Sequence, residues 1–185
     1  MEVRPLKFDG VWELTPPTFR DNRGEFTEAF VHHKLLAATG SLFNVAQVNL
    51  STSTKGTIRG IHFSKLPPGQ AKYVQCTSGQ IIDFIIDVRP DSATFGQWDS
   101  VILDSATHNA VHIPSGFGHA FQALSDSATV VYLCDTPYAP EHELGINPLD
   151  ETIALAFAVS DYVLSDKDRN APSLIDIDKA LLPHS

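Results

Sequence analysis

The stretch that decides the fold lies at residues 81–89 and reads IIDFIIDVR. Successive side chains of a strand point to opposite sides, so the apolar residues of this stretch fall on both faces of an extended chain. A strand that is apolar on both faces must be covered on both faces. The stretch therefore predicts a sheet with a second packed layer.

Short runs of strand type lie on both sides of this stretch, and turns rich in Gly, Pro, Asp and Ser separate them. The predicted strands are 45–51, 57–63, 72–77, 80–88, 98–103, 110–113, 119–124 and 129–134. Many short strands at close spacing predict an all-β sandwich or barrel. Helical periodicity is convincing only at 28–39 and 176–182, which Gly40 and Pro183 terminate, so helices are expected only as short accessories.

Composition indicates one folded domain that spans residues 1–185. Hydrophobic residues make up 43% of the chain and charged residues 19%, which is typical of a globular protein. The net charge of −9 repels nucleic acid and anionic membranes, so we expect neither as a partner.

No apolar run is long enough for a secretory signal or a membrane span, which predicts a cytoplasmic protein. Cys76 and Cys134 form no Cys-x-x-Cys pair and are expected as buried, reduced thiols.

Two groups of strand segments hold most of the polar side chains that could carry chemistry. The first group is 47–49, 59–62 and 70–72, and the second is PSGFGHAF at 114–121 followed by Tyr132. In a regular strand Arg59 and Ile61 face away from His62, unless a bulge at Gly60 re-aims one of them. Polar groups at such positions in an apolar barrel indicate a binding or catalytic site.

The segment 114–119 has the pattern Pro-x-Gly-x-x-His and resembles the second motif of the cupin superfamily, whose fold is a double-stranded β-helix or jelly-roll barrel. Such a histidine often ligates a metal in cupins, together with a His-x-His pair and a downstream Glu in the first motif. Here Phe63 and Ser64 follow His62, and no Glu lies within the next turn. A site with one or two histidines lacks the three or four ligands that hold transition metals, so we predict neither a metal nor another cofactor.

Several motifs in one order resemble the dTDP-4-dehydrorhamnose 3,5-epimerase family. They are RGIH at 59–62, QAKYV at 70–74, DFIIDVR at 83–89, TFGQW at 94–98, GFGHAF at 116–121 and LSDKD at 164–168. The resemblance extends from about Gly10 to Pro172. It implies a metal-free cupin-type barrel that forms a homodimer. The implied substrate is a dTDP-4-keto-6-deoxy sugar, in which C3, C5 or both are inverted.

The resemblance also implies which residues move protons. A ketone at C4 acidifies the hydrogens on C3 and C5, so epimerisation needs a base on one face of the ring and an acid on the other. His62 resembles the base of the family, and Asp168 resembles the carboxylate that orients its imidazole. Lys72 resembles the cation that stabilises the enolate oxygen. Tyr132 resembles the acid, because a phenol with an ordinary pKa of ~10 stays protonated at neutral pH.

The remaining site residues are implied as ligands of the sugar nucleotide. Arg59 or His119 would assist Lys72, and a diphosphate approaching an acidic protein requires placed cations. The residues that resemble the diphosphate ligands are Arg23, Arg59 and Lys167. Gln47 and Asn49 resemble contacts near the diphosphate and sugar, and Glu28 and Glu143 resemble nucleoside or sugar contacts. Tyr138 and Phe26 resemble the pair that stacks on thymine. The segment with Arg23, Phe26 and Glu28 would reach across the dimer into the partner's pocket.

Alternatives remain at the level of the sequence. Without the resemblance, His62 and Tyr132 are more simply interpreted as packed strand residues, and Asp168 as a loop residue or helix cap. A 3,4-ketoisomerase and a non-catalytic sugar-nucleotide-binding cupin are the alternative functions. Gly118 and Ala120 stand where the family commonly has Ala and Gly, and we expect them to shape the floor of the pocket. Whether the pathway makes rhamnose or an antibiotic sugar stays open.

Overall fold

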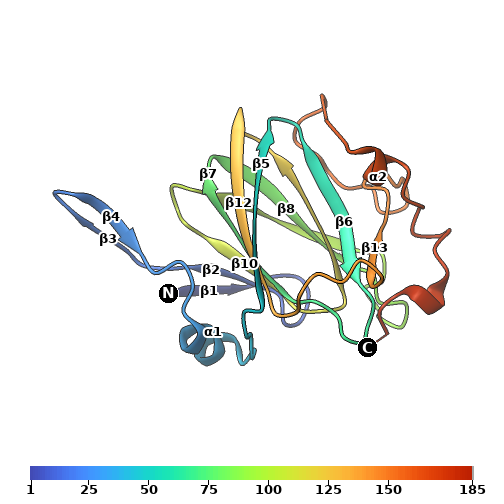
Figure 1. The fold of residues 1–185 in the computed structure, drawn as a ribbon, viewed down its shortest axis with the longest axis horizontal. Helices are drawn as coiled ribbons and strands as arrows, with labels where there is room; N and C mark the ends of the chain where they lie inside the picture. The colour runs from blue at the N-terminus through green and yellow to red at the C-terminus, as the bar shows by residue number, and fades with distance from the viewer. Residues whose placement is uncertain (185) are drawn as a thin grey trace.

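The computed structural model describes residues 1–184, and all its strands except a separate hairpin form two facing sheets (Figure 1). The six-stranded sheet holds, in this order, β1 (Glu2–Pro5), β2 (Trp12–Thr15), β10 (Ala110–Ile113), β7 (Lys72–Ser78), β12 (Ser127–Cys134) and β5 (Gln47–Thr54). The five-stranded sheet holds β13 (Glu143–Gly145), β6 (Ile58–Ser64), β11 (Phe117–Ala123), β8 (Gln80–Asp87) and β9 (Trp98–Asp104). Neighbouring strands pair antiparallel, as in a jelly-roll barrel, and the prediction of an all-β fold is confirmed.

Strand β8 lies inside the five-stranded sheet and is covered on both faces, as the sequence predicts. Ile81 and Ile85 face the interior between the two sheets, where they join the largest apolar cluster. Phe84 and Ile86 face outward into a second cluster, which residues 146–182 of the C-terminal segment cover. We call this second cluster the outer cluster; it makes the C-terminal segment part of the fold.

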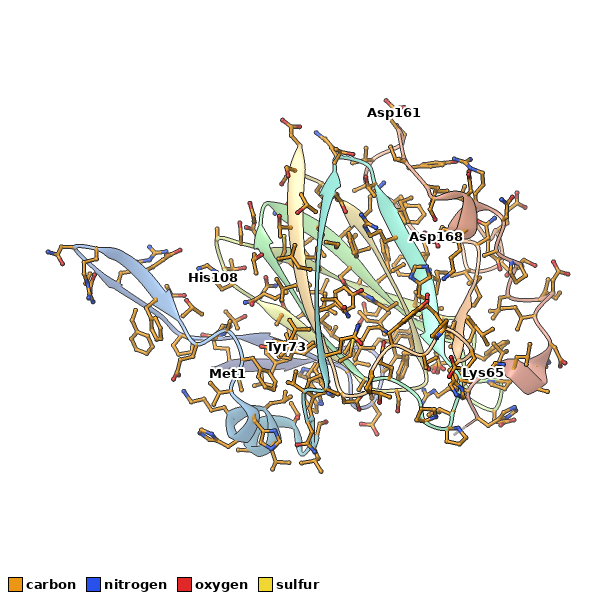
Figure 2. All side chains as sticks on the ribbon, viewed as in Figure 1. Met1, Lys65, Tyr73, His108, Asp161 and Asp168 are labelled. Atoms are coloured by element: carbon orange, nitrogen blue, oxygen red, sulfur yellow. The ribbon has the colours of Figure 1, made fainter. Side chains whose placement is uncertain are left out.

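The outer face of the six-stranded sheet is covered only in part. Helix α1 (His32–Thr39) packs over one end of it (Figure 1), and Leu35, Phe43 and Tyr73 form a buried cluster there. Tyr73, labelled in Figure 2, also donates its hydroxyl to the carbonyl of Ala29 at 2.9 Å. On the free edge strand β5, Val48 and Leu50 remain 60% and 68% exposed. This part of the sheet presents an apolar surface to solvent.

The N-terminal region contains a hairpin that the sequence does not predict. Strands β3 (Thr18–Asp21) and β4 (Gly24–Thr27) pair only with each other and project away from the barrel (Figure 1). Phe19 and Phe26 on this hairpin are 57% and 64% exposed. The hairpin has no core of its own in this chain.

Both predicted helices are shorter than expected. The helix predicted at 28–39 begins only at His32, because Phe30 packs against Phe43 and Tyr73 and holds the preceding chain extended. At 176–182 the chain forms only a 3-10 turn, Lys179–Leu181. Ile177 and Leu182 both pack into the outer cluster, and a spacing of five residues does not place them on one face of a helix.

The two cysteines are free and buried, as predicted. None of the helices within residues 1–184 has the length and apolar character needed to span a bilayer.

Candidate active site

A bulge in β6 places the first two polar side chains. Phe121 on β11 pairs with Arg59, and His119 pairs with His62. Between these two pairs β6 contains one residue more than β11. Gly60 supplies the bulge with φ of 118°, and a Cβ there would lie 2.5 Å from the carbonyl oxygen of His119. The bulge turns Ile61 into the core and brings Arg59 and His62 to one hollow.

His62 is paired with Asp168. Its Nε2 lies 2.7 Å from Oδ1 of Asp168. Asp168 is labelled in Figure 2 and sits on the short helix α2 (Asp166–Arg169). Ser165 caps this helix and accepts the backbone N–H of Asp168 at 3.1 Å. Burial acts to raise the pKa of Asp168, but hydrogen bonds from His62 and from the backbone of Gly60 outweigh it and lower that pKa. An ionised Asp168 takes the Nε2–H of His62 and leaves Nδ1 with a free lone pair.

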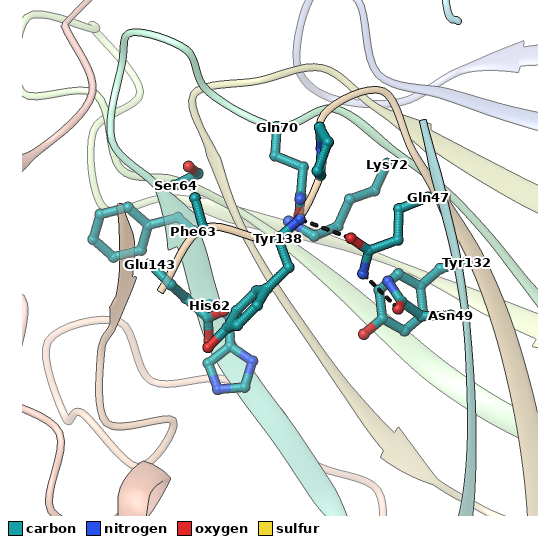
Figure 3. A pocket seen from close by; sticks show the side chains of 12 residues that line it. Gln47, Asn49, His62, Phe63, Ser64, Gln70, Lys72, Tyr132, Tyr138 and Glu143 are labelled. Atoms are coloured by element: carbon teal, nitrogen blue, oxygen red, sulfur yellow. Dashed lines mark hydrogen bonds between the residues drawn. The ribbon is translucent and has the colours of Figure 1, made fainter. Parts of the chain in front are cut away.

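Lys72 and Tyr132 stand on the facing wall. They belong to β7 and β12 of the six-stranded sheet, whereas His62 belongs to the five-stranded sheet, and Figure 3 shows the three side chains around one cavity. Lys72 is only 8% exposed, and this burial lowers the pKa of its ammonium group. Cys134 and Glu143 act to raise that pKa but do not outweigh the burial. Burial raises the pKa of the Tyr132 phenol, so this phenol keeps its proton at neutral pH.

Two adjoining hollows meet at His62, Lys72 and Tyr132. The first has a volume of about 300 Å³ and opens toward the loop with Tyr138 (Figure 3). The second has a volume of about 430 Å³ and extends toward α2. Together they form one elongated site, which we call the double hollow. Its other predicted residues are Gln47, Asn49, Tyr138 and Glu143 in the first hollow, and Arg59, His119, Lys167 and Asp168 in the second.

The polar lining of the first hollow is hydrogen-bonded. Gln47 donates its amide to Asn49 at 2.7 Å and accepts the backbone N–H of Tyr138 at 2.7 Å (Figure 3). Lys167 reaches Glu143 at 2.8 Å, which joins α2 to β13. Tyr138 itself is 54% exposed, so one face of its ring is free to stack on a planar ligand.

A second histidine–carboxylate pair lies at the base of the double hollow. His119 Nε2 is 2.7 Å from Oδ2 of Asp83, and Asp83 is completely buried. Burial raises the pKa of Asp83, while the nearby His119 acts in the opposite direction. Asp83 is not among the site residues predicted from the sequence, although a carboxylate within the buried stretch 81–89 is a signal that a partner must exist.

Three predicted site residues do not join the double hollow within one chain. Arg23 lies on the projecting hairpin and pairs with Asp21 at 2.5 Å. Phe26 is exposed on the same hairpin, and Glu28 pairs with Lys34 of α1. The chain alone therefore does not bring these three residues to the site.

The expectation for Gly118 and Ala120 is wrong. A Cβ on Gly118 would lie 2.7 Å from Ile61 Cγ2 and 3.2 Å from Val88, and Ala120 is part of the outer cluster. Both positions flank His119 on a strand, so they point away from the hollow that His119 lines. Within residues 1–184, no three His, Cys, Asp or Glu side chains gather closely enough to hold a metal ion.

Comparisons with known proteins identify the family. A sequence model of dTDP-4-dehydrorhamnose 3,5-epimerase matches residues 5–176. A dTDP-4-dehydrorhamnose 3,5-epimerase of Mycolicibacterium smegmatis is 44% identical over 97% of this chain and 89% of the relative. A dTDP-4-dehydro-6-deoxyglucose 3-epimerase of a Streptomyces species is 43% identical over 98% of this chain and 93% of the relative.

A solved structure shows the same fold. The 4-keto-6-deoxy sugar epimerase NovW from the novobiocin biosynthetic gene cluster of Streptomyces spheroides superposes with a TM-score of 0.96 at 42% identity. The match covers 100% of this chain and 93% of NovW. These findings confirm the resemblance seen in the sequence motifs. The chain belongs to the dTDP-4-dehydrorhamnose 3,5-epimerase family.

Proposed function

We propose that this protein is an epimerase, an isomerase that inverts C3, C5 or both of a dTDP-4-keto-6-deoxy sugar in rhamnose or antibiotic-sugar biosynthesis. The observation that carries the proposal is the placement of His62, paired with Asp168 at 2.7 Å, across the double hollow from Tyr132. A base and an acid on opposite walls suit removal of a proton from one ring face and its return to the other. The relatives are named as epimerases of dTDP-sugars, which supports the same reaction.

The first step is proton abstraction. The C4 ketone lies against Lys72, whose ammonium group stabilises the negative charge that develops on the oxygen. Nδ1 of His62 takes the proton from C3 or C5 as the C–H bond breaks, and the electron pair moves into the enolate. Asp168 stabilises the imidazolium through Nε2–H, because the buried, charge-assisted hydrogen bond strengthens as His62 becomes positive.

The second step returns a proton from the opposite face. The Tyr132 hydroxyl donates its proton to the same carbon, the C4 ketone re-forms, and the carbon is inverted. Solvent then reprotonates Tyr132 and removes the proton from His62. This sequence consumes no redox equivalent, and His62, Tyr132 and solvent together account for every proton that moves.

Binding uses the rest of the double hollow. Arg59 and Lys167 supply positive charge for the diphosphate, and the exposed ring of Tyr138 offers a stacking surface for thymine. Gln47 and Asn49 present amides beside Tyr138, and Glu143 and His119 are the other proposed ligands that one chain supplies. In the free chain Glu143 already holds Lys167, so the diphosphate must exchange with this carboxylate.

We also propose a homodimer in which each pocket contains residues of both chains. The projecting hairpin with exposed Phe19 and Phe26, and the free edge of β5 with Val48 and Leu50, are surfaces that a second copy would cover. Arg23, Phe26 and Glu28 would then reach the partner's double hollow. Light scattering at micromolar concentration checks this, and a monomer would contradict the shared pocket.

Other functions are less favoured. A 3,4-ketoisomerase would move the carbonyl and release a 3-keto product, and a binding protein would need neither a base nor an acid. The relatives named above are epimerases, which favours neither alternative. The lack of a metal and of any other cofactor, the lack of nucleic-acid and membrane partners, and the cytoplasmic location stay predictions from the sequence.

Incubation with dTDP-4-keto-6-deoxyglucose in D₂O tests the proposal. Proton NMR should show loss of the H3 signal, the H5 signal or both as deuterium replaces these protons, together with the inverted product, and the lost signals show which carbons react. No exchange at either carbon would refute the proposal. A 3-keto product would replace it with the ketoisomerase, and activity lost to a chelator with stoichiometric metal would overturn the metal-free assignment.

A further inference from the structure

The two histidine–carboxylate pairs of the double hollow differ in the number of groups that reach the carboxyl. Asp168 has hydrogen bonds from the ring of His62 and from the backbone of Gly60. Asp83 meets His119 through Oδ2 alone, and its Oδ1 has no hydrogen-bond partner among the described residues. Asp83 is also the more deeply buried of the two, since none of it is exposed. The two pairs therefore stabilise a negative charge on the carboxyl to different degrees.

The surroundings of Asp83 favour its protonated form. A completely buried carboxylate needs partners on both oxygens to stay ionised, because it has lost its hydration. Lys72 acts on Asp83 through its charge but does not donate to the unpaired Oδ1. Protonation removes most of the penalty, since Oδ1 is then an uncharged carbonyl oxygen. Burial raises the pKa of Asp83 against the opposing effects of His119 and Lys72, in agreement with this geometry.

A proton on Asp83 fixes the tautomer of His119. Oδ2 of Asp83 then donates to Nε2 at 2.7 Å, so the ring carries its own proton on Nδ1. Nδ1 of His119 makes no hydrogen bond within residues 1–184 and is not enclosed by protein, so its N–H opens onto the second hollow. His62 has the opposite arrangement, because Asp168 takes its Nε2–H and leaves a lone pair on Nδ1. One ring can accept a proton, and the other can donate a hydrogen bond.

We propose that Asp83 is a positioning residue that works as a protonated acid and makes His119 donate its Nδ1–H to the C4 ketone oxygen of the substrate. The inference rests on the proposed function. Lys72 and His119 come from facing sheets and line the same hollow, so both can contact one oxygen between them. Both contacts strengthen as negative charge develops on that oxygen. Asp83 and His119 exchange no proton with the substrate, so His62 still removes the proton and Tyr132 still returns one.

The same substitution in both pairs tests the inference. Asparagine has the shape of aspartate, and its amide N–H donates to Nε2 as a protonated carboxyl does. Asp83→Asn should therefore keep kcat within about 10-fold of the wild-type value, whereas Asp168→Asn should lose about 10²- to 10⁴-fold. His119→Ala removes the donor itself and should lower kcat by roughly 10²- to 10³-fold. A larger loss in Asp83→Asn with dTDP binding intact, or a wild-type rate in His119→Ala, would overturn the inference.

NMR of the ligand-free wild-type protein determines the tautomers without any need for activity. With ¹⁵N-labelled histidine at neutral pH, His119 should carry its proton on Nδ1 and His62 on Nε2, and the spectra of His119→Ala and His62→Ala assign the two rings. A proton on Nε2 of His119 would overturn the inference while the epimerase assignment stands. If the wild type exchanges no deuterium at C3 or C5, the proposed function fails and the role of His119 at the ketone fails with it, whereas the NMR still shows whether Asp83 is protonated.

Discussion

Replacement of Asp168 by asparagine should slow proton abstraction without loss of nucleotide binding. The side chain of Asp168 is 7% exposed, and its Oδ1 lies 2.7 Å from His62 Nε2. Asparagine keeps the shape but removes the charge that stabilises the imidazolium. Its amide group can also donate to Nε2, which would move the ring proton to Nδ1 and block the base.

The structure sets the size of the expected effect. A hydrogen bond to a charged group contributes about 1.5–3 kcal/mol, which corresponds to a rate loss of roughly 10- to 150-fold. The wrong tautomer of a histidine held by an amide adds to this loss and can bring it to about 10⁴-fold. We therefore expect kcat to fall by about 10²- to 10⁴-fold. Affinity for dTDP should stay within about twofold, since Asp168 carries no contact assigned to thymine or diphosphate.

Deuterium incorporation at C3 and C5, followed by NMR, gives the rate, and calorimetry gives the affinity for dTDP. Asp166→Asn is the matched control, because Asp166 lies on the same helix but is exposed. It should retain the wild-type rate. A loss below about 10-fold in Asp168→Asn would refute the reasoning, because it is smaller than the weakest charge-assisted bond predicts.

Three further predictions concern other parts of the site and its scaffold. Tyr132→Phe should still exchange deuterium with retention, while inverted product falls by roughly 10²-fold; near-normal inversion would assign the acid elsewhere. Gly60→Ala should lower the free energy of unfolding in urea by more than about 2 kcal/mol, because the added Cβ meets β11. Gly24→Ala, with φ of 128° and no atom within 4 Å, should lose less, and equal losses would contradict the argument. Burial acts to raise the pKa of Asp87, but hydrogen bonds from Arg89, Ser92 and Thr94 outweigh it and lower this pKa from 3.8 to about 2. The ionised Asp87 therefore stabilises the fold above pH 3.8, and this contribution disappears as the pH falls toward about 2. Asp87→Asn should lack this component of acid destabilisation in denaturation curves; the same acid slope in both proteins would contradict it.

The barrel could be predicted from the sequence because its signals are local. The stretch 81–89 is apolar on both faces, and the structure covers it on one side with the facing sheet and on the other with residues 146–182. The hairpin at 18–27 could not be predicted in this way, because neither strand buries an apolar face against the rest of the chain. Helix α2 spans only Asp166–Arg169, which is too short to show a helical period.

The candidate site depended on contacts that the pattern of residues does not contain. His62 and Asp168 are separated by 106 positions, so only the resemblance joined them before the structure was known. Gly60 gave a local hint, because a glycine within a strand indicates a bulge, and the bulge decides that Arg59 and His62 share a face.

The most direct test of the account is solvent exchange by His62→Ala. If His62 is the base, deuterium incorporation from D₂O should fall at C3 and C5 alike by roughly 10²- to 10⁴-fold, while the Kd for dTDP stays within about twofold of the wild-type value. Exchange at either carbon near the wild-type rate in His62→Ala, with nucleotide binding intact, would contradict the assignment of His62 and with it the proposed mechanism.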